Sequence, residues 1–389
     1  MTSRTRRWGR RLAVALLATV LVLTGSFYVL GGLEFSGQIR ADALAVRPAT
    51  TGHDLTEVRA DRRRIVLDET AQSHDELASD GVFGITWTGG YGRLHGPAST
   101  APGERVDRDF RLLRGRLPDP GASVGWSRNA FPDPRTALGR PVRAMAYDGD
   151  LGAMPAWFAP GRTDTWAVLV HGKGESRTEM LRLMRATTAA GLPTLAITYR
   201  NDVGAPRDPS GRYQYGRTEW RDLAAAVDHA TAHGARRVVL VGTSMGGAVV
   251  ASYLRHVEDH TRIAGLVLDA PMLDLGAVVS YAASRRALPV LGHVPASLAW
   301  TAKRFATLRY GVDWGALDYV DDTRWLDRPT LVFHGTDDGT VPVALSRRLA
   351  AAHPDLVTLR EVPGAGHVAS WNADPAAYER RVRGFLARL

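Results

Sequence analysis

The chain of 389 residues contains no cysteine, and two lysines stand among its 49 basic residues. Without cysteine the chain has no disulfide, no cysteine-ligated zinc site and no thiol nucleophile. Its share of hydrophobic residues is 45% and of charged residues 23%, as in ordinary globular proteins. The mean hydropathy of −0.15 excludes a protein built mainly of membrane spans. These absences predict a largely globular chain whose chemistry uses side chains other than thiols.

The positive charge is concentrated at the N-terminus. The formal net charge is +9, and five arginines with no acidic residue precede residue 12. No basic helix with interleaved aromatic residues occurs elsewhere in the sequence, so the charge does not indicate a nucleic-acid partner. We therefore interpret residues 1–11 as a basic tail whose charge orients the following segment in a membrane.

An uncharged, mostly apolar run follows the tail, from Leu12 to Leu33. As a helix it would span roughly 33 Å, close to the hydrocarbon thickness of a bilayer. It is longer than the apolar core of a cleaved signal peptide, and no small-residue cleavage site follows closely. We expect an uncleaved single-pass anchor, with a cytoplasmic N-terminus by the positive-inside rule and the rest outside the cytoplasm. Secretion after signal cleavage is the alternative.

Residues 34–140 are expected to form an accessory, β-rich segment. Arg64–Leu67 and Val82–Thr88 are typical of strands, and Thr88–Tyr91 predicts a tight hairpin because its two glycines accept positive φ. The segment contains no catalytic motif.

From residue 141 to 389 the pattern predicts an α/β fold. Short apolar runs alternate with helical stretches, which implies a mostly parallel sheet covered by helices on both faces. Functional side chains in such sheets follow the carboxyl ends of the strands. The predicted strands are Trp166–Val170, Pro193–Thr198, Arg237–Val241, Ile263–Leu268 and Thr330–Phe333, and the predicted helices are Glu175–Ala190, Thr218–His233 and Met245–His256.

A nucleophile motif follows one of these strands. Residues 242–246 read Gly-Thr-Ser-Met-Gly, the G-x-S-x-G pattern that lifts a serine above the sheet on a strained strand-to-helix turn. A serine hydroxyl needs a base, and His367 in a glycine-rich loop is the best candidate. The base needs a carboxylate to orient it, and Asp338 follows a predicted strand. The chain order Ser244, Asp338, His367 is that of the α/β-hydrolases.

These residues, with the segments HGKGES (171–176), HGTDDGTVP (334–342) and PGAGH (363–367), resemble the α/β-hydrolase superfamily. Within it, residues 141–389 resemble the lysophospholipase-like and monoacylglycerol-lipase-like serine hydrolases. The family pattern assigns the acid to Asp338. Asp337 is the second choice, and Asp269 and Asp274 are more distant ones.

The same resemblance implies further parts of the site. The backbone N–H groups of Lys173 and Met245 would form the oxyanion hole. A helical cap, rich in aromatic residues, would be inserted at about 275–325 and cover the site. His171 and His334 are expected to shape loops by hydrogen bonding, and Glu219 and Asp222 to tether a helix start. No metal-binding or dinucleotide-binding pattern occurs, so we predict neither metal nor cofactor.

The sequence therefore predicts a membrane-anchored serine hydrolase that cleaves carboxylic esters with acyl or lipid-like character through an acyl-enzyme. Activity is expected to rise with pH as His367 loses its proton. A serine peptidase of the same fold and a surface protein that has lost catalysis are the alternatives.

Overall fold

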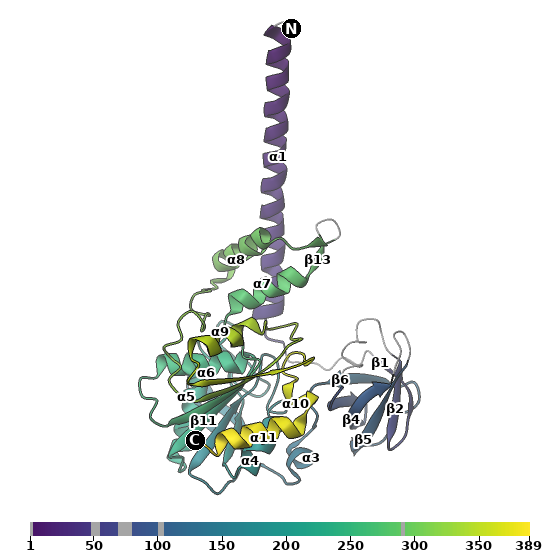
Figure 1. Cartoon of the computed structure of the whole chain (residues 1–389), viewed down its shortest axis with the longest axis vertical. Helices are drawn as coiled ribbons and strands as arrows, with labels where there is room; N and C mark the ends of the chain where they lie inside the picture. The colour runs from purple at the N-terminus through teal and green to yellow at the C-terminus, as the bar shows by residue number, and fades with distance from the viewer. Residues whose placement is uncertain (1–2, 48–54, 69–79, 100–104, 289–291) are drawn as a thin grey trace. The chain divides into compact units, whose positions relative to one another are not determined.

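The computed structural model describes residues 3–47, 55–68, 80–99, 105–288 and 292–389 (Figure 1). The chain divides into two compact units. One combines Met1–Ala45 with Leu275–Ala316, and the other combines Val46–Asp274 with Leu317–Leu389.

A mostly parallel sheet organises the larger unit. Within the described residues its strand order is β16-β15-β12-β11-β9-β10-β8-β7. Six of these strands, β9 to β12 with β15 and β16, run parallel and are connected through helices, whereas the β7–β8 hairpin adds two antiparallel strands at one edge. The strands are β7 (Arg143–Gly149), β8 (Gly152–Ala159), β9 (Thr165–Val170), β10 (Thr194–Ile197), β11 (Arg237–Thr243), β12 (Ile263–Asp269), β15 (Thr330–Gly335) and β16 (Val357–Val362).

Helices cover both faces of this sheet (Figure 1). On one face α4 packs against α11, and on the other α5 packs against α6. The strands between them are almost wholly buried, which explains their continuous apolar sequences. The helices are α3 (Pro134–Leu138), α4 (Leu181–Ala189), α5 (Trp220–Ala232), α6 (Met245–His256), α9 (Ala344–Ala352), α10 (Ser370–Ala373) and α11 (Pro375–Leu386).

One predicted helix is wrong in its extent. The stretch Glu175–Ala190 was expected to be helical throughout, but α4 begins only at Leu181. Before it, successive i→i+3 hydrogen bonds form tight turns, among them those from the N–H of Glu179 and Met180. Gly174, with φ +72°, lies at the start of these turns. The helical period continues through them, so the sequence pattern did not reveal the later start.

The accessory segment forms a closed β-barrel. Its strand order among the described residues is β1-β2-β5-β4-β3-β6, and β1 pairs with β6 to close it. The predicted hairpin joins β3 to β4 through Thr88 and Gly89, and Gly89 rather than Gly90 adopts positive φ. The strands are β1 (Leu55–Ala60), β2 (Arg64–Asp68), β3 (Phe83–Trp87), β4 (Gly90–Ser99), β5 (Val106–Gly115) and β6 (Ser123–Ser127).

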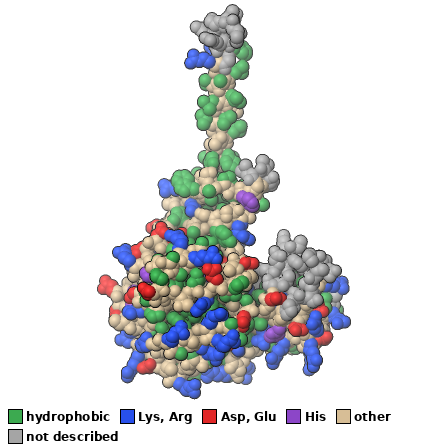
Figure 2. Space-filling view, viewed as in Figure 1, with side chains coloured by type: hydrophobic (Ala, Val, Ile, Leu, Met, Phe, Trp, Pro, Cys, Tyr) green, Lys and Arg blue, Asp and Glu red, His purple; other side chains and the backbone are tan. Residues whose placement is uncertain are grey.

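The smaller unit is helical. It contains α1 (Ser3–Gln38), the short π-helix η1 (Ile39–Leu44), α7 (Leu275–Arg285), the two-residue strands β13 (Ala287–Leu288) and β14 (Gly292–His293), and α8 (Ala296–Tyr310). Apolar side chains of α1 lie on its surface (Figure 2). The apolar stretch within Arg10–Leu44 has a mean hydropathy of 2.2, and none of it is buried. By length and composition this helix is able to cross a membrane.

Helix α8 packs closely on the C-terminal part of α1. A Cβ atom on Gly31 would lie 2.9 Å from Leu298 Cδ1, and one on Gly32 would lie 2.6 Å from Phe305 Cδ2. Small residues at such a crossing let two helices approach. Arg309 adds hydrogen bonds from Nη1 to the Leu33 carbonyl oxygen at 2.9 Å and to Ser36 Oγ at 2.8 Å.

Candidate active site

Ser244 lies on a strained turn between β11 and α6. Its φ of 48° and ψ of −118° are values that residues other than glycine rarely adopt. The two glycines of the motif are required by packing. A Cβ atom on Gly242 would lie 2.7 Å from the Gly246 carbonyl oxygen, and one on Gly246 would collide with the carbonyl oxygen of Val170. The G-x-S-x-G spacing therefore has a steric cause in this fold.

The structure brings together the three side chains that the sequence selected. His367 follows β16 and Asp338 follows β15, so both lie at the carboxyl edge that also carries Ser244. His367 Nε2 lies 2.9 Å from Ser244 Oγ, and His367 Nδ1 lies 2.7 Å from Asp338 Oδ2. With Nδ1–H donating to the carboxylate, Nε2 is free to accept the serine proton. This arrangement is able to perform nucleophilic catalysis by serine.

Asp338 is held as a carboxylate. Its Oδ1 accepts hydrogen bonds from the backbone N–H groups of Thr340 and Val341, each at 2.8 Å, and His334 Nε2 lies 3.3 Å from Oδ2. Burial alone would raise its pKa, but hydrogen bonds from His334, His367 and Val341 hold the pKa well below its ordinary value. An Asp338 side chain that stays ionised is able to orient His367 and to stabilise its protonated form.

The other carboxylates considered from the sequence lie elsewhere. Asp337, the neighbour of Asp338, is exposed. Asp269 is buried at the end of β12 and accepts a hydrogen bond from Ser370 at 3.0 Å. Asp274 forms an isolated antiparallel β-bridge with Asp318 through the backbone. Burial raises the pKa of Asp269 to about 6. Asp338 is therefore the acid that the geometry favours.

The loop expected to supply an oxyanion N–H lies beside the serine. A Cβ atom on Gly172 would lie 3.1 Å from Ser244 Cβ, so the loop that contains Lys173 borders the nucleophile. The Glu179 carboxylate accepts hydrogen bonds from Gly172 N–H at 2.8 Å and from the Thr243 hydroxyl at 2.6 Å. Glu179 thereby fixes the loop to the residue that precedes Ser244.

Sequence reasoning missed this role of Glu179. Burial would raise its pKa, but the Arg182 charge and the hydrogen bonds from Thr243 and Gly172 keep the pKa below its ordinary value. The residue stands in a stretch with helical character, 64 positions before Thr243. No spacing rule connects two residues so far apart, so the sequence carried no signal for the contact.

The histidines expected to shape loops do so. His171 is fully buried, with Nε2 2.9 Å from Asp202 Oδ2 and Nδ1 2.9 Å from the Gly172 carbonyl oxygen. Burial lowers its pKa, but the Asp202 charge and hydrogen bonds outweigh that effect and raise it to about 9. His334 Nδ1 lies 2.7 Å from Ser346 Oγ. Both predictions are confirmed.

The predicted tethers at the start of α5 are also confirmed. Glu219 accepts hydrogen bonds from the N–H groups of Gln214 at 2.7 Å and Gly216 at 2.9 Å. Asp222 accepts three hydrogen bonds from the backbone and side chain of the buried Arg200. Each carboxylate thus stabilises the loop before the helix and lies outside the Ser244 site. Among the described residues, no group of three or more His, Cys, Asp or Glu side chains is arranged to hold a metal ion.

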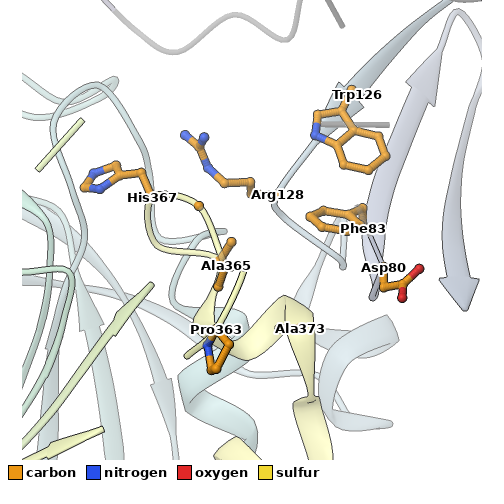
Figure 3. Close-up of a pocket in the computed structure, with 11 residues that line it drawn as sticks. Asp80, Phe83, Trp126, Arg128, Pro363, Ala365, His367 and Ala373 are labelled. Carbon is orange, nitrogen blue, oxygen red and sulfur yellow. The ribbon is translucent and has the colours of Figure 1, made fainter. Parts of the chain in front are cut away.

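A cavity of about 500 Å³ lies next to His367 (Figure 3). One wall is the loop from Pro363 to His367, and the other comes from the barrel, with Phe83, Trp126 and Arg128. The sequence pattern assigned no site residue to the barrel, so these lining residues were missed. Barrel closure brings β3 and β6 together, and that pairing is not visible in either strand alone.

Comparisons with known proteins agree with this fold. Residues 161–313 match the family model Hydrolase_4, described as serine aminopeptidase, S33. That match contains Ser244 and ends before Asp338 and His367. An uncharacterized protein of Mycobacterium tuberculosis is 28% identical over 255 residues, which cover 63% of this chain and 76% of that protein. A non-heme haloperoxidase of Rhodococcus erythropolis is 41% identical over 58 residues, 15% of this chain and 21% of that protein.

Among solved structures, the Pyrococcus furiosus esterase Pf2001 is similar with a TM-score of 0.51 and 19% identity, covering 65% of this chain and 95% of that one. A second crystal form of the same esterase gives a TM-score of 0.52. At this identity the likeness establishes the fold. The predicted α/β-hydrolase fold is therefore confirmed, and residues 161–313 resemble the S33 serine aminopeptidase family model.

Proposed function

We propose that this protein is a serine hydrolase that cleaves carboxylic esters. The observation that carries the proposal is the continuous chain of hydrogen bonds from Ser244 Oγ through His367 to Asp338, which starts at a strained nucleophile turn. Strain of this kind at a reactive side chain is typical of sites where backbone geometry serves chemistry.

In the proposed reaction, Ser244 Oγ attacks the acyl carbon while His367 Nε2 takes its proton. The ionised Asp338 keeps His367 in the tautomer with Nδ1–H and stabilises the imidazolium. His367 then gives the proton to the oxygen of the leaving alcohol, and the carbon–oxygen bond breaks to leave an acyl-Ser244 ester. Water, activated by the same histidine, releases the acid and restores the serine.

The negative charge that develops on the acyl oxygen needs donors fixed in advance. We assign them to the backbone N–H groups of Met245 and Lys173. Met245 begins the 12-residue helix α6, so its N–H has no acceptor within the helix. Lys173 follows Gly172, whose position Glu179 fixes. Each donor of this kind typically stabilises the transition state by about 2.7–4 kcal/mol.

We further propose that α1 is an uncleaved anchor, with the N-terminus in the cytoplasm and the hydrolase outside it. The apolar stretch of α1 is long enough to span a bilayer, and arginines precede it. The contacts between α8 and α1 support retention of the helix, because cleavage would remove the surface that Leu298 and Phe305 cover. The segment 275–325 serves as the cap in this proposal.

The test is covalent labelling by a fluorophosphonate probe, which reacts with activated serines. Detergent-solubilised full-length protein is expected to be labelled, and Ser244→Ala is expected to lose labelling completely. Ser370→Ala is the matched control: its hydroxyl is buried and hydrogen-bonded to the Asp269 carboxylate, but it has no histidine partner in the described structure. Well-folded protein that the probe does not label would support a surface protein without catalysis and would overturn the proposal.

A serine peptidase is the second candidate, favoured by the description of the matching family model. A panel of p-nitrophenyl esters and aminoacyl arylamides separates the two. We expect Ser244-dependent hydrolysis of the esters and little of the arylamides. Faster turnover of the arylamides would replace the esterase assignment while leaving the serine mechanism intact.

A further inference from the structure

The barrel contributes one wall of the cavity beside His367. Strands β3 and β6 pair antiparallel with Gly84 opposite Ser127. Phe83, directly before Gly84, and Arg128, directly after Ser127, therefore lie at the same end of the barrel. Phe83 and Trp126 form an aromatic pair with ring centroids 4.2 Å apart and an interplanar angle of 31°. An aromatic surface and a cation thus line the cavity opposite the loop that carries His367.

This wall is fixed to the hydrolase part of the same unit. The N–H of Val82 donates a hydrogen bond to the Asn372 carbonyl oxygen at 2.9 Å, and Asn372 Nδ2 donates to the Arg128 carbonyl oxygen at 2.9 Å. Gly81 leaves no room for a side chain, because a Cβ atom would collide with the Asn372 carbonyl oxygen. The backbone beside the aromatic pair and at Arg128 is therefore held in place by the backbone and the side chain of Asn372.

Arg128 and Asp80 are the two acidic or guanidinium side chains that line the cavity, and Asp80 lies on the far side of Phe83 from His367 (Figure 3). The Arg128 side chain is half-buried, and its guanidinium extends toward the side on which the His367 ring lies, whereas the Trp126 and Phe83 rings lie on the opposite side of Arg128 (Figure 3). Within the described ranges this guanidinium makes no hydrogen bond or ion pair. Glu175 attracts it at longer range, but that carboxylate accepts a hydrogen bond from Asn129 at 3.2 Å, and burial raises its pKa.

The proposed mechanism indicates which part of a substrate enters this cavity. His367 Nε2 delivers its proton to the leaving oxygen, so the alcohol part of the ester must lie on the His367 side of Ser244. The cavity is lined by the His367 loop and is of a size typical for small-molecule sites. The cavity, which His367 lines and Ser244 does not, therefore lies on the side of the site where the alcohol part leaves.

Resting on the proposed esterase function, we propose that this cavity binds the alcohol part of an ester that carries an anionic group beside an apolar or aromatic group. Arg128 holds the anionic group, and Trp126 and Phe83 contact the apolar part. A guanidinium forms charge-assisted hydrogen bonds with carboxylate or phosphate oxygens, which are stronger than neutral ones. The barrel thus determines specificity without contributing to the chemical step.

The test compares two acetyl esters of matched shape, anionic 4-acetoxybenzoate and neutral 4-acetoxybenzamide. Both form the same acetyl-Ser244 intermediate, so kcat/KM reports the alcohol part alone. In Arg128→Gln we expect the ratio of kcat/KM for the anionic over the neutral ester to fall roughly tenfold or more, as for a lost hydrogen bond to a charged group. Arg128→Lys is expected to fall between the two, and Trp126→Ala to lower the values for both esters.

Arg116→Gln is the matched control, because Arg116 is an exposed barrel arginine whose partner is Asp119 at 3.4 Å. It is expected to leave both kcat/KM values unchanged. An unchanged ratio in folded, probe-labelled Arg128→Gln would overturn the inference while the esterase function stands.

A binding measurement separates the two proposals. Calorimetric titration of the Ser244→Ala protein with 4-hydroxybenzoate and 4-hydroxybenzamide requires no turnover. Tighter binding of the carboxylate that Arg128→Gln abolishes would support the site even if neither ester were hydrolysed. Equal binding of both compounds, with and without Arg128, would count against the site whatever the activity.

Discussion

The open sheet and the closed barrel of the larger unit differ in the side chains that they bury. Along the carboxyl edge of the sheet, buried polar side chains hydrogen-bond to the loops around Ser244, and they include His171, Glu179, Asp269, His334 and Asp338. The inward cluster of the barrel is mostly apolar instead, with Leu55, Ile65, Leu67, Ile85, Trp87, Leu94, Val106, Phe110 and Val124. Arg108 of β5 is the charged exception: it is fully buried and donates hydrogen bonds to the carbonyl oxygens of Gly81 and Gly96.

This difference follows from topology. Parallel strands end at a common edge, and the loops that leave it can hold polar side chains around one point. The barrel strands pair antiparallel, so their carboxyl ends are divided between the two ends of the barrel and do not gather at one edge. In the proposed enzyme the sheet therefore carries the chemistry, while the barrel contributes side chains from its end to the wall of a cavity. The following predictions test this division.

The largest expected effect concerns two adjacent carboxylates. Asp338→Asn should lower kcat for ester hydrolysis by roughly 10⁴-fold, because an amide favours the wrong histidine tautomer and does not stabilise the imidazolium. Asp337→Asn, which changes an exposed neighbour, should retain activity within about twofold. Steady-state kinetics on a p-nitrophenyl ester measures both. Equal losses in the two variants would mean that the sheet edge around His367 does not hold the acid in this way.

The sequence predicted the sheet far better than the barrel. The runs at 166–170 and 238–241 are continuously apolar because both faces of the strands are covered, and α6 begins and ends where predicted. Strand β5, by contrast, reads Val-Asp-Arg-Asp-Phe-Arg-Leu-Leu-Arg-Gly, with one face toward solvent. Its partners β2 and β4 are fixed by closure of the barrel, a long-range property that single strands do not encode.

The candidate site divides in the same way. Ser244, Asp338 and His367 were predicted because each stands in a motif with a local steric or chemical cause. Glu179 and Arg128 were not, because their contacts join segments that are distant in the sequence. A residue whose role depends on tertiary contacts leaves no pattern in one chain. Motif reasoning therefore finds reacting groups more readily than the groups that position them or select a substrate.

The second prediction asks whether the barrel core is separable from the sheet core. Ile85 and Leu169 are both fully buried, in distinct apolar clusters of the barrel and the sheet. Truncation of either to alanine should destabilise its own cluster by about 2–5 kcal/mol. In Ile85→Ala, calorimetry should show an early transition, and fluorophosphonate labelling of Ser244 should persist above it until the sheet unfolds. In Leu169→Ala, labelling of Ser244 should be lost at the temperature at which the sheet unfolds. One shared transition in both variants would show that barrel and sheet unfold together.

The smallest expected effect concerns the free energy of unfolding that is lost by burying the Asp269 carboxylate at the carboxyl edge of the sheet. Burial raises the pKa of Asp269 to about 6 from an ordinary value of 3.8. The folded state therefore holds the proton more tightly than the unfolded state, so this group loses stability as pH rises from about 4 to 6. The gap between the two pKa values corresponds to roughly 3 kcal/mol at neutral pH. An asparagine does not titrate and keeps an oxygen to accept the Ser370 hydrogen bond.

Asp269→Asn should therefore gain on the order of 2–3 kcal/mol relative to wild type between pH 4 and pH 7, measured by denaturant unfolding at each pH. Asp337→Asn, at an exposed position, is the control and should change by less than about 0.5 kcal/mol. A flat difference for Asp269→Asn would mean that its carboxylate is as well solvated in the fold as in the unfolded chain. The gain would instead show that the sheet edge carries the buried Asp269 carboxylate at a cost in stability.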